Sequence, residues 1–315
     1  MTNSPERTSP SADFAIPADG TTLRPRRTRL PPALALLRPH QWVKNAFVAA
    51  PLFFTPGALS LGNILLIVAG VLSFCLIASA VYVLNDFVDR HADRMHPVKR
   101  SRPIASGAVS PAMAAVLLAG ALTAGMALAF GLDLAFGVLA AVYFVINMAY
   151  SFGLKHISIV DVMCITLGFI LRVMAGAALI GVEPSVWIIA CTGLVALFLA
   201  LAKRRDDLVR SLGGQHRKSL DGYTKPFLDT AIAVVLGALL VNYMMYTTDA
   251  SVAGSVGSER LYLTVPFVIA GILRYLQIML VEERSGAPTT IMLTDRFMIV
   301  SVGLWALSFA GLVYL

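Results

Sequence analysis

Three aspartates follow an apolar run, Ile64 to Leu84, that is long enough to cross a lipid bilayer. Asp86, Asp89 and Asp93 have the spacing i, i+3, i+7, so a continuing helix places all three carboxylates on one face. Asn85 adds an amide oxygen beside them. Adjacent carboxylates repel one another unless a cation lies between them, and such hard oxygen ligands suit Mg²⁺, which also accepts substrate phosphates. These four residues, here called the aspartate cluster, are therefore predicted to hold Mg²⁺.

A basic segment comes directly after the aspartate cluster. Lys99, Arg100 and Arg102 are suited to clamp phosphate groups of a metal-bound substrate. The plain alternative is a solvated loop at the membrane edge, but such loops do not usually place carboxylates in helical register next to a basic tail. His91 and His96 could suggest a zinc site, but they are five residues apart and have no cysteine nearby. The aspartates are the better metal ligands. The segment therefore predicts a metal site followed by phosphate-binding cations.

The composition is that of a membrane protein. Of the 315 residues, 57% are hydrophobic and only 14% are charged, and the mean hydropathy is +0.77. The net charge of +7 is carried by short loops between apolar runs, which makes it a topology signal and argues against a nucleic-acid partner. The three cysteines lie inside apolar runs and are predicted to be buried thiols outside any disulfide framework.

The apolar runs predict an all-α, multi-pass membrane protein with about nine transmembrane helices. A spanning helix needs about 20 apolar residues, and lipid cannot satisfy open backbone groups, so the spans must be helical. The runs lie at 44–60, 63–84, 111–130, 134–151, 160–181, 186–203, 227–247, 261–281 and 297–315.

The chain divides into a tail and one membrane domain. Residues 1–30, rich in Ser, Pro, Thr and Arg, are expected to be a disordered basic tail, and residues 31–315 to form the transmembrane domain. Leu34 to Trp42 is predicted to be a short amphipathic helix at the membrane surface. The first apolar run is the least regular, because Pro51 and Pro56 interrupt it.

Basic residues mark one side of the membrane. The connections 90–102, 203–225 and 284–296 and the site of Lys155 carry the Lys and Arg, whereas Arg260 is the only basic residue at the other side. The positive-inside rule therefore predicts a cytoplasmic N-terminus and a cytoplasmic active site.

Further candidate residues lie around the fifth predicted span. Tyr150, Lys155 and Asp161 surround its start, and Arg172 lies about three turns further on, at mid-membrane depth. A charge at that depth is costly and is usually paired or lines a wet cavity. Two interpretations stay open: Arg172 pairs with Asp161 and joins two helices, or it meets an anionic substrate.

A second charge-rich stretch ends the sixth predicted span. Lys203, Arg204 and Asp207 are followed by Arg217 and Lys218. The carboxylate could hold a second metal or act as a base, and the cations could bind phosphate. The alternative is a simple ion pair between Lys203 and Asp207, which are four residues apart on one helical face.

The pattern from Asn85 to Asp93 resembles the first aspartate-rich motif of the UbiA superfamily, whose members are intramembrane transferases with nine helices around a central cavity. Over roughly residues 36–300, further segments resemble the decaprenyl-phosphate phosphoribosyltransferase branch. These segments are Arg38 to Asn45, His96 to Ala105, Tyr150-Ser151, Leu154-Lys155, Asp161-Val162, Arg172, Gly176, Lys203-Arg204, Arg217 to Leu220, Tyr223, Leu273 to Tyr275 and Asp295-Arg296.

The resemblance implies a reaction in which phosphoribosyl pyrophosphate (PRPP) gives its 5-phosphoribosyl group to a polyprenyl (decaprenyl) phosphate and releases pyrophosphate. In the family, this reaction supplies a cell-wall precursor. It implies that Mg²⁺ on the aspartate cluster holds the pyrophosphate, and that the enzyme lies in a bacterial inner membrane. Arg38 and Lys44 are the expected partners of the lipid phosphate. One departure is Asp207, where the branch has Glu.

The predicted site has two parts. The catalytic residues are Asp86, Asp89, Asp93 and Asp207. The substrate-binding residues are Arg38, Lys44, Asn85, Lys99, Arg100, Arg102, Tyr150, Lys155, Asp161, Arg172, Lys203, Arg204, Arg217 and Lys218.

Two rival functions are weighed against this one. An aromatic prenyltransferase of the same superfamily would carry a second acidic pair, but four residues beyond Asp206 and Asp207 stand Arg210 and Ser211. A transporter would distribute its charges over both sides or the midplane, whereas these lie almost entirely on one side. Nucleotide-binding and hydrolase motifs are absent from the sequence. A homo-oligomer is compatible with the sequence.

Overall fold

The computed structural model describes residues 30–96, 99–210, 218–282, 291 and 294–314. The elements of this described part are all helical, which confirms the all-α fold class. Residues 1–29, predicted to be a disordered tail, lie outside the described residues.

Eight helices within the described residues are long and apolar enough to cross a membrane. They are α3 (Leu61–Val88), α5 (Pro111–Leu132), α6 (Leu134–Phe152), α7 (Val160–Leu179), α8 (Val186–Arg210), α9 (Lys225–Thr248), α11 (Val265–Leu280) with the preceding η7 (Leu261–Thr264), and α13 (Arg296–Tyr314). Each coincides with a predicted span to within a few residues. A short α10 (Ala250–Val256) joins α9 to η7.

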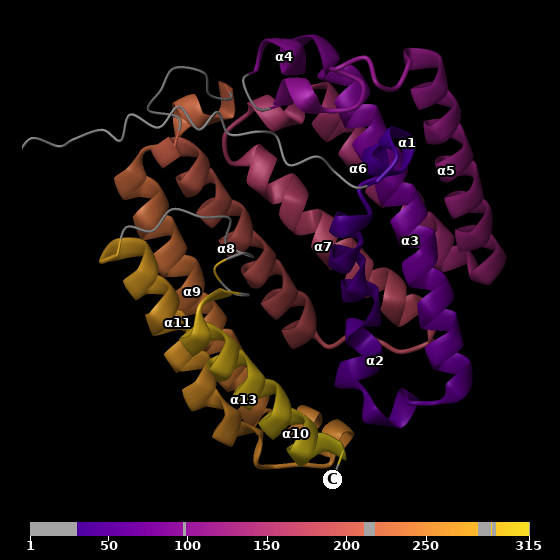
Figure 1. The fold of residues 1–315 in the computed structure, drawn as a ribbon. Coiled ribbons are helices and arrows are strands. Elements are labelled where there is room, and N and C mark those ends of the chain that lie inside the picture. Colours follow the sequence, from indigo (N-terminus) through magenta and orange to yellow (C-terminus); the bar gives the residue numbers. More distant parts are fainter. Residues whose placement is uncertain (1–29, 97–98, 211–217, 283–290, 292–293, 315) are drawn as a thin grey trace, which may run out of the picture.

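The first predicted span has a different form. It consists of a 3₁₀ helix η1 (Pro39–Ala49), a short α2 (Ala50–Phe54) and η2 (Pro56–Ala58), and it runs alongside α3 (Figure 1). The 3₁₀ geometry rises by about 2 Å per residue, so η1 and α2 together cover a depth similar to that of the longer helices. We count this segment as the ninth crossing.

The amphipathic helix predicted at Leu34 to Trp42 is shorter in the structure. α1 covers only Pro32–Leu36, and Arg38 adopts the left-handed conformation with φ 53°. The right-handed helix ends before Pro39, because the proline ring disfavours the right-handed α conformation in the residue before it. Trp42 lies in η1 instead, where its indole Nε1 donates to Ser79 Oγ of α3 at 3.0 Å.

Helix starts explain why the spans begin where they do. Ser60, Ser110 and Thr224 each accept a hydrogen bond from a backbone N–H three residues further on, and Asp133 caps α6 in the same way. Side-chain caps of this kind satisfy the orphan donors of the first turn. The sequence pattern and the capping chemistry therefore agree on the helix boundaries.

Figure 1 shows two groups of helices. α3, α5 and α6 lie on one side and α8, α9, α11 and α13 on the other, with α7 packed against α6 and α8. At the end far from the aspartates, Phe53 of α2 stacks on Phe309 of α13, and Tyr314 donates to the Phe53 carbonyl at 2.6 Å. The first and last crossings are thus joined at that end.

η1 and α7 approach each other closely at Gly176. A Cβ atom added at Gly176 would lie 1.9 Å from the carbonyl oxygen of Val48, a backbone atom that cannot give way cheaply. Only glycine at this position lets the two backbones approach so closely.

Substituting Gly176→Ala should therefore lower the free energy of unfolding by at least about 3 kcal/mol, the upper end of overpacking costs. Thermal unfolding of the purified protein in detergent measures this. Gly237→Ala is the matched control, because a Cβ at Gly237 meets nothing within 4 Å. Equal melting temperatures for the two variants would contradict the predicted packing of η1 on α7.

Candidate active site

The aspartate cluster lies where α3 passes into α4 (Arg90–Met95). Helical hydrogen bonds continue across this junction, with Asp89 N–H donating to Asn85 O at 2.9 Å and Asp93 N–H to Asp89 O at 2.8 Å. The helical register required for a shared face is therefore present. Asp86 and Asp93 are both buried on it, with 2% and 4% of their surface exposed.

Arg102 bridges these two carboxylates. Its Nη1 lies 3.0 Å from Asp86 Oδ1 and 2.7 Å from Asp93 Oδ2. Arg38 adds a second cation, with Nη2 2.6 Å from the same oxygen of Asp86. Asp86 and Asp93 thus converge on one guanidinium nitrogen, and two cations balance their charges.

Asp89 faces a different partner. Lys155, in the short helix η4 (Leu154–His156), is 3% exposed, and its Nζ lies 2.5 Å from Asp89 Oδ1 and 3.3 Å from Asn85 Oδ1. Over the residues that the structure describes, no three His, Cys, Asp or Glu side chains are grouped so that they could hold a metal ion. Cationic side chains stand between the carboxylates, and the metal site expected from the spacing requires that they move away.

Arg172 is buried in the middle of the bundle without a carboxylate partner among the described residues. It is 5% exposed, and it donates to Asn45 Oδ1 at 2.9 Å, to Gly168 O at 2.8 Å and to the Tyr143 hydroxyl at 2.8 Å. The interpretation that Arg172 pairs with Asp161 is wrong. The reason is that neutral acceptors and the faces of aromatic rings surround the guanidinium.

Other cations lie near Arg172. Lys44, half-buried in η1, forms no ion pair with a described residue and lies close enough to Arg38, Arg172 and Lys203 for their charges to repel. A group of cations with so little carboxylate among them favours binding of an anion.

Asp161 belongs to a second buried network. It is fully buried, its Oδ2 lies 2.5 Å from Arg204 Nε, and its Oδ1 accepts from the Tyr223 hydroxyl at 2.8 Å. Arg204, itself 1% exposed, also contacts Asp207 Oδ2 at 2.8 Å. Asp207, which is half-buried, lies at the more open end of this network and is joined to Asp161 through Arg204.

The remaining residues of the predicted site that the structure describes lie at the same end of the bundle. Lys99 and Arg100 form η3 (Lys99–Ser101), with Lys99 half-buried and Arg100 exposed. Burial lowers the pKa of His96, and its Nδ1 accepts from the Lys99 N–H at 3.3 Å, which favours a neutral imidazole over a cationic one. Tyr150 is half-buried at the end of α6. Arg217 and the side chain of Lys218 lie outside the described residues.

Three residues absent from the predicted site set hold it together: Asn45 and Tyr143, which bind Arg172, and Tyr223, which binds Asp161. Each is a polar group within or beside an apolar run. That pattern was the available signal, because a polar side chain in lipid must find a buried partner.

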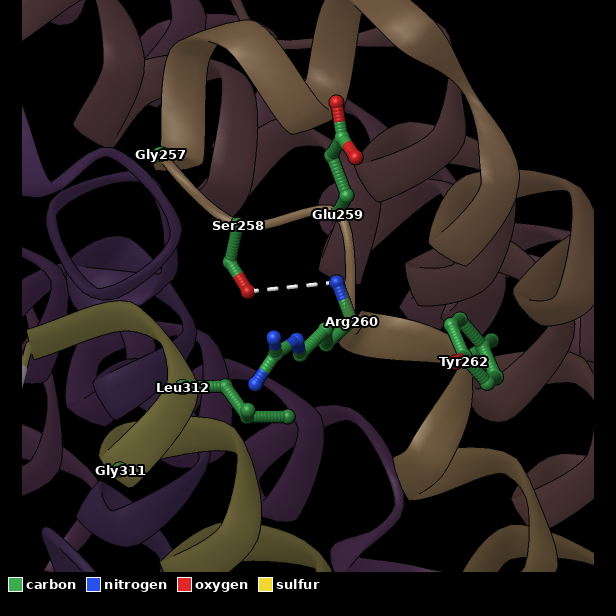
Figure 2. A pocket seen from close by; sticks show the side chains of 7 residues that line it. All are labelled: Gly257, Ser258, Glu259, Arg260, Tyr262, Gly311 and Leu312. Carbon is green, nitrogen blue, oxygen red and sulfur yellow. Dashed lines mark hydrogen bonds between the residues drawn. The ribbon is translucent and has the colours of Figure 1, made fainter.

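A surface pocket of about 570 Å³ lies at the opposite end of the bundle, where the connection from α10 to η7 meets the end of α13 (Figure 2). Its lining includes Glu259, Arg260 and Tyr262, and the Arg260 N–H donates to Ser258 Oγ at 3.4 Å. This pocket contains none of the predicted site residues, so the candidate active site is the aspartate end.

The chain is similar to known proteins over most of its length. A model of the UbiA prenyltransferase family matches residues 45–311. The chain is 34% identical to a decaprenyl-phosphate phosphoribosyltransferase of Corynebacterium glutamicum, over 94% of this chain and 92% of the relative. It is 31% identical to a protein of the same name from Mycolicibacterium smegmatis, over 93% of this chain and 96% of the relative.

Solved structures share the fold. A UbiA homolog from Archaeoglobus fulgidus bound to DMAPP and Mg²⁺ superposes with a TM-score of 0.66 at 20% identity, covering 90% of this chain and 99% of that one. The same homolog bound to GPP and Mg²⁺ gives a TM-score of 0.65 at 22% identity, covering 89% of this chain and 99% of the other. At this identity the likeness establishes the fold alone.

Proposed function

The chain belongs to the UbiA prenyltransferase family, and from this premise we propose that it is a membrane phosphoribosyltransferase. It transfers 5-phosphoribose from PRPP to a polyprenyl phosphate and releases pyrophosphate. Relatives that are named for this activity and match nearly the full chain support the assignment. An acceptor of decaprenyl length follows from their names.

The observation that carries the proposal is the excess of cations between the aspartate end and the middle of the bundle. Arg38, Arg102 and Lys155 are paired with carboxylates, but Lys44 and Arg172 have none among the described residues. A phosphate monoester is the anion that such a pair can neutralise. We assign Lys44 and Arg172, together with Arg38, to the phosphate of the lipid acceptor.

The aspartate cluster fits Mg²⁺ in the chemistry of its donors, since Asn85, Asp86, Asp89 and Asp93 offer hard oxygens only. When bound, a divalent cation neutralises the pyrophosphate leaving group. Once those carboxylates have another partner, Arg102 and Lys155 are free to bind the donor's phosphates, and Arg38 is free to bind the phosphate of the lipid acceptor. Substrate binding is thus an exchange of ion-pair partners.

The reaction needs no strong base from the protein. An oxygen of the lipid phosphate, already anionic, forms a bond to C1 of the ribose while the bond from C1 to the pyrophosphate oxygen breaks. The electron pair of that bond leaves with pyrophosphate, so no proton has to be removed from the nucleophile. The protein's task is to orient the two phosphorylated substrates and to stabilise the leaving charge.

The ion-pair exchange makes a quantitative prediction. Mg²⁺ alone should bind weakly, because three cations occupy its ligands, and pyrophosphate should raise the Mg²⁺ affinity by about tenfold or more, a coupling of at least ~1.4 kcal/mol. Isothermal titration calorimetry of the purified protein with and without pyrophosphate, corrected for the Mg²⁺–pyrophosphate complex in buffer, measures this. Equal affinities in the two titrations would contradict the exchange.

The activity is tested with radiolabelled PRPP and polyprenyl phosphate in detergent, with mass spectrometry of the lipid product. Lipid-linked phosphoribose that forms with Mg²⁺ and disappears with EDTA is the expected result. Prenylation of an aromatic acceptor from a polyprenyl pyrophosphate, with no product from PRPP, would favour the rival enzyme of the same family. Uptake into proteoliposomes without lipid product would favour a transporter.

We place the aspartate end and the N-terminus in the cytoplasm of a bacterial cell, with the protein in the inner membrane, because the basic connections share that side. Cysteines introduced at the two ends test this orientation. Ser106→Cys should be protected from a membrane-impermeant maleimide in intact cells, whereas Ser255→Cys should react. The reverse pattern would overturn the orientation.

A further inference from the structure

The turn that leads into α7 is strained. Ile159 has φ 70° and ψ −50°, and the N–H of Val160 donates to the carbonyl of Ser158 at 2.8 Å. These features define the rare γ-turn with a positive central φ. A β-branched residue is an outlier in this region of backbone space, so the surrounding structure must hold the turn in place.

The Tyr223 hydroxyl group holds it on one side. The Tyr223 hydroxyl accepts a hydrogen bond from the N–H of Ile159 at 2.6 Å and donates one to Asp161 Oδ1 at 2.8 Å. Tyr223 is 4% exposed, and Asp161 is in turn fixed by Arg204. The strained turn is therefore anchored to α8 and to the segment that follows it.

The anchoring segment is packed directly against the turn. η6 (Lys218–Gly222) ends at Gly222, where an added Cβ would lie 2.1 Å from Ser158 Oγ. Contact this close leaves little room for the turn to relax toward η6. Loss of the tyrosine hydroxyl would free the turn on the other side.

The turn sits between α7 and the residue that reaches the aspartate cluster. Lys155 lies four residues before Ile159. Two backbone hydrogen bonds connect the segments on either side: Ile157 N–H donates to Leu154 O at 3.1 Å, and Asp161 N–H donates to Ile157 O at 3.0 Å. Lys155 Nζ in turn contacts Asp89 and Asn85. A displacement of the turn is therefore passed to the Lys155 ammonium.

We propose that Tyr223 is a positioning residue. It holds the strained turn at Ile159, and the turn fixes Lys155 at the aspartate cluster. There the Lys155 ammonium binds the phosphates of the donor substrate. The proposal rests on the proposed function for the identity of the donor. Tyr223 does not itself contact the aspartate cluster. Its effect is exerted through the backbone between Ile159 and Lys155.

Tyr223→Phe tests the proposal, because it removes the hydroxyl and keeps the ring that stacks on Phe227. We expect the KM for PRPP to rise about tenfold, as for a lost buried hydrogen bond, with kcat changed less than twofold. Pyrophosphate affinity, measured by calorimetry in the presence of Mg²⁺, should fall by a similar factor. Tyr246→Phe is the matched control, since the buried Tyr246 hydroxyl has no hydrogen-bond partner among the described atoms.

A second substitution separates positioning from general loss of structure. Glycine adopts positive φ without a steric penalty, so Tyr223→Phe combined with Ile159→Gly should recover at least threefold of the lost pyrophosphate affinity. Absence of this rescue, or an unchanged KM and affinity in Tyr223→Phe, would overturn the proposal.

The proposed function fails separately. If wild-type protein makes no lipid product from PRPP, that function is wrong, while the pyrophosphate titrations still decide the role of Tyr223. If wild-type protein is active and only the Tyr223 effects are missing, the positioning role is wrong and the function stands.

Discussion

Substitution of Asp86 or Asp93 by asparagine should lower turnover by at least about a thousandfold while the helix bundle stays folded. The amide keeps the shape of the carboxylate but removes the charge that attracts the metal and balances Arg102. Metal ions contribute several kcal/mol of charge stabilisation, and each ~1.4 kcal/mol corresponds to a factor of ten in rate. Steady-state rates with saturating PRPP and Mg²⁺ measure the loss.

Asp133→Asn is the control for this pair. Asp133 caps α6 at the other end of the bundle, where its Oδ1 accepts from the Phe136 N–H at 2.8 Å, and asparagine caps a helix equally well. Its turnover should equal that of the wild type. Activity within tenfold of wild type in Asp86→Asn or Asp93→Asn would exclude a metal-binding role for that carboxylate.

Arg172→Met should abolish most activity without destabilising the protein. The arginine is buried with neutral partners only, so its charge is costly to the folded state. A methionine of similar length removes that cost, but it leaves the lipid phosphate without its cation. Because hydrogen bonds to charged groups are worth ~1.5–3 kcal/mol, we expect kcat/KM for polyprenyl phosphate to fall by about ten- to a hundredfold. Kinetics and thermal unfolding on the same preparation test both parts.

Arg204→Met should give the opposite stability result. Arg204 is paired with the fully buried Asp161 at 2.5 Å, and removal of one partner from a buried ion pair leaves an uncompensated charge that costs about 3–5 kcal/mol. A marked fall in melting temperature for Arg204→Met beside an unchanged or raised one for Arg172→Met is the expected contrast. If Arg172→Met were the less stable of the two, the assignment of Arg172 to the substrate would lose its basis.

The long helices were predictable because capping residues and prolines close to each boundary determine where these helices begin. The run predicted at 111–130 forms α5 from Pro111 to Leu132, with Ser110 as its cap and Pro111 at the first helical position. The first crossing was not predictable in detail. Its apolar content marks a span, but the segment divides into η1, α2 and η2, each with a proline in its first two positions, and no hydrophobic period reveals this division.

The candidate site was predictable in its residue types and only partly in its pairings. The register of Asp86 and Asp93 follows from helix geometry and is present in the structure. The partner of Asp89 is Lys155, 66 residues away, and Arg172 finds Asn45 at a separation of 127 residues. Contacts between such distant segments depend on how the helices pack, which spacing within one segment does not encode.

The aromatic contact between α2 and α13 has a consequence for biogenesis. Phe53 and Tyr314 are 261 residues apart, and the hydroxyl of one donates to the carbonyl of the other. α13 is the last of the described helices to be synthesised, so the first crossing lies in the bilayer without this neighbour until α13 is inserted. The contact between α2 and α13 therefore forms late in biogenesis, and until then Phe53 and Phe54 are open to surrounding acyl chains.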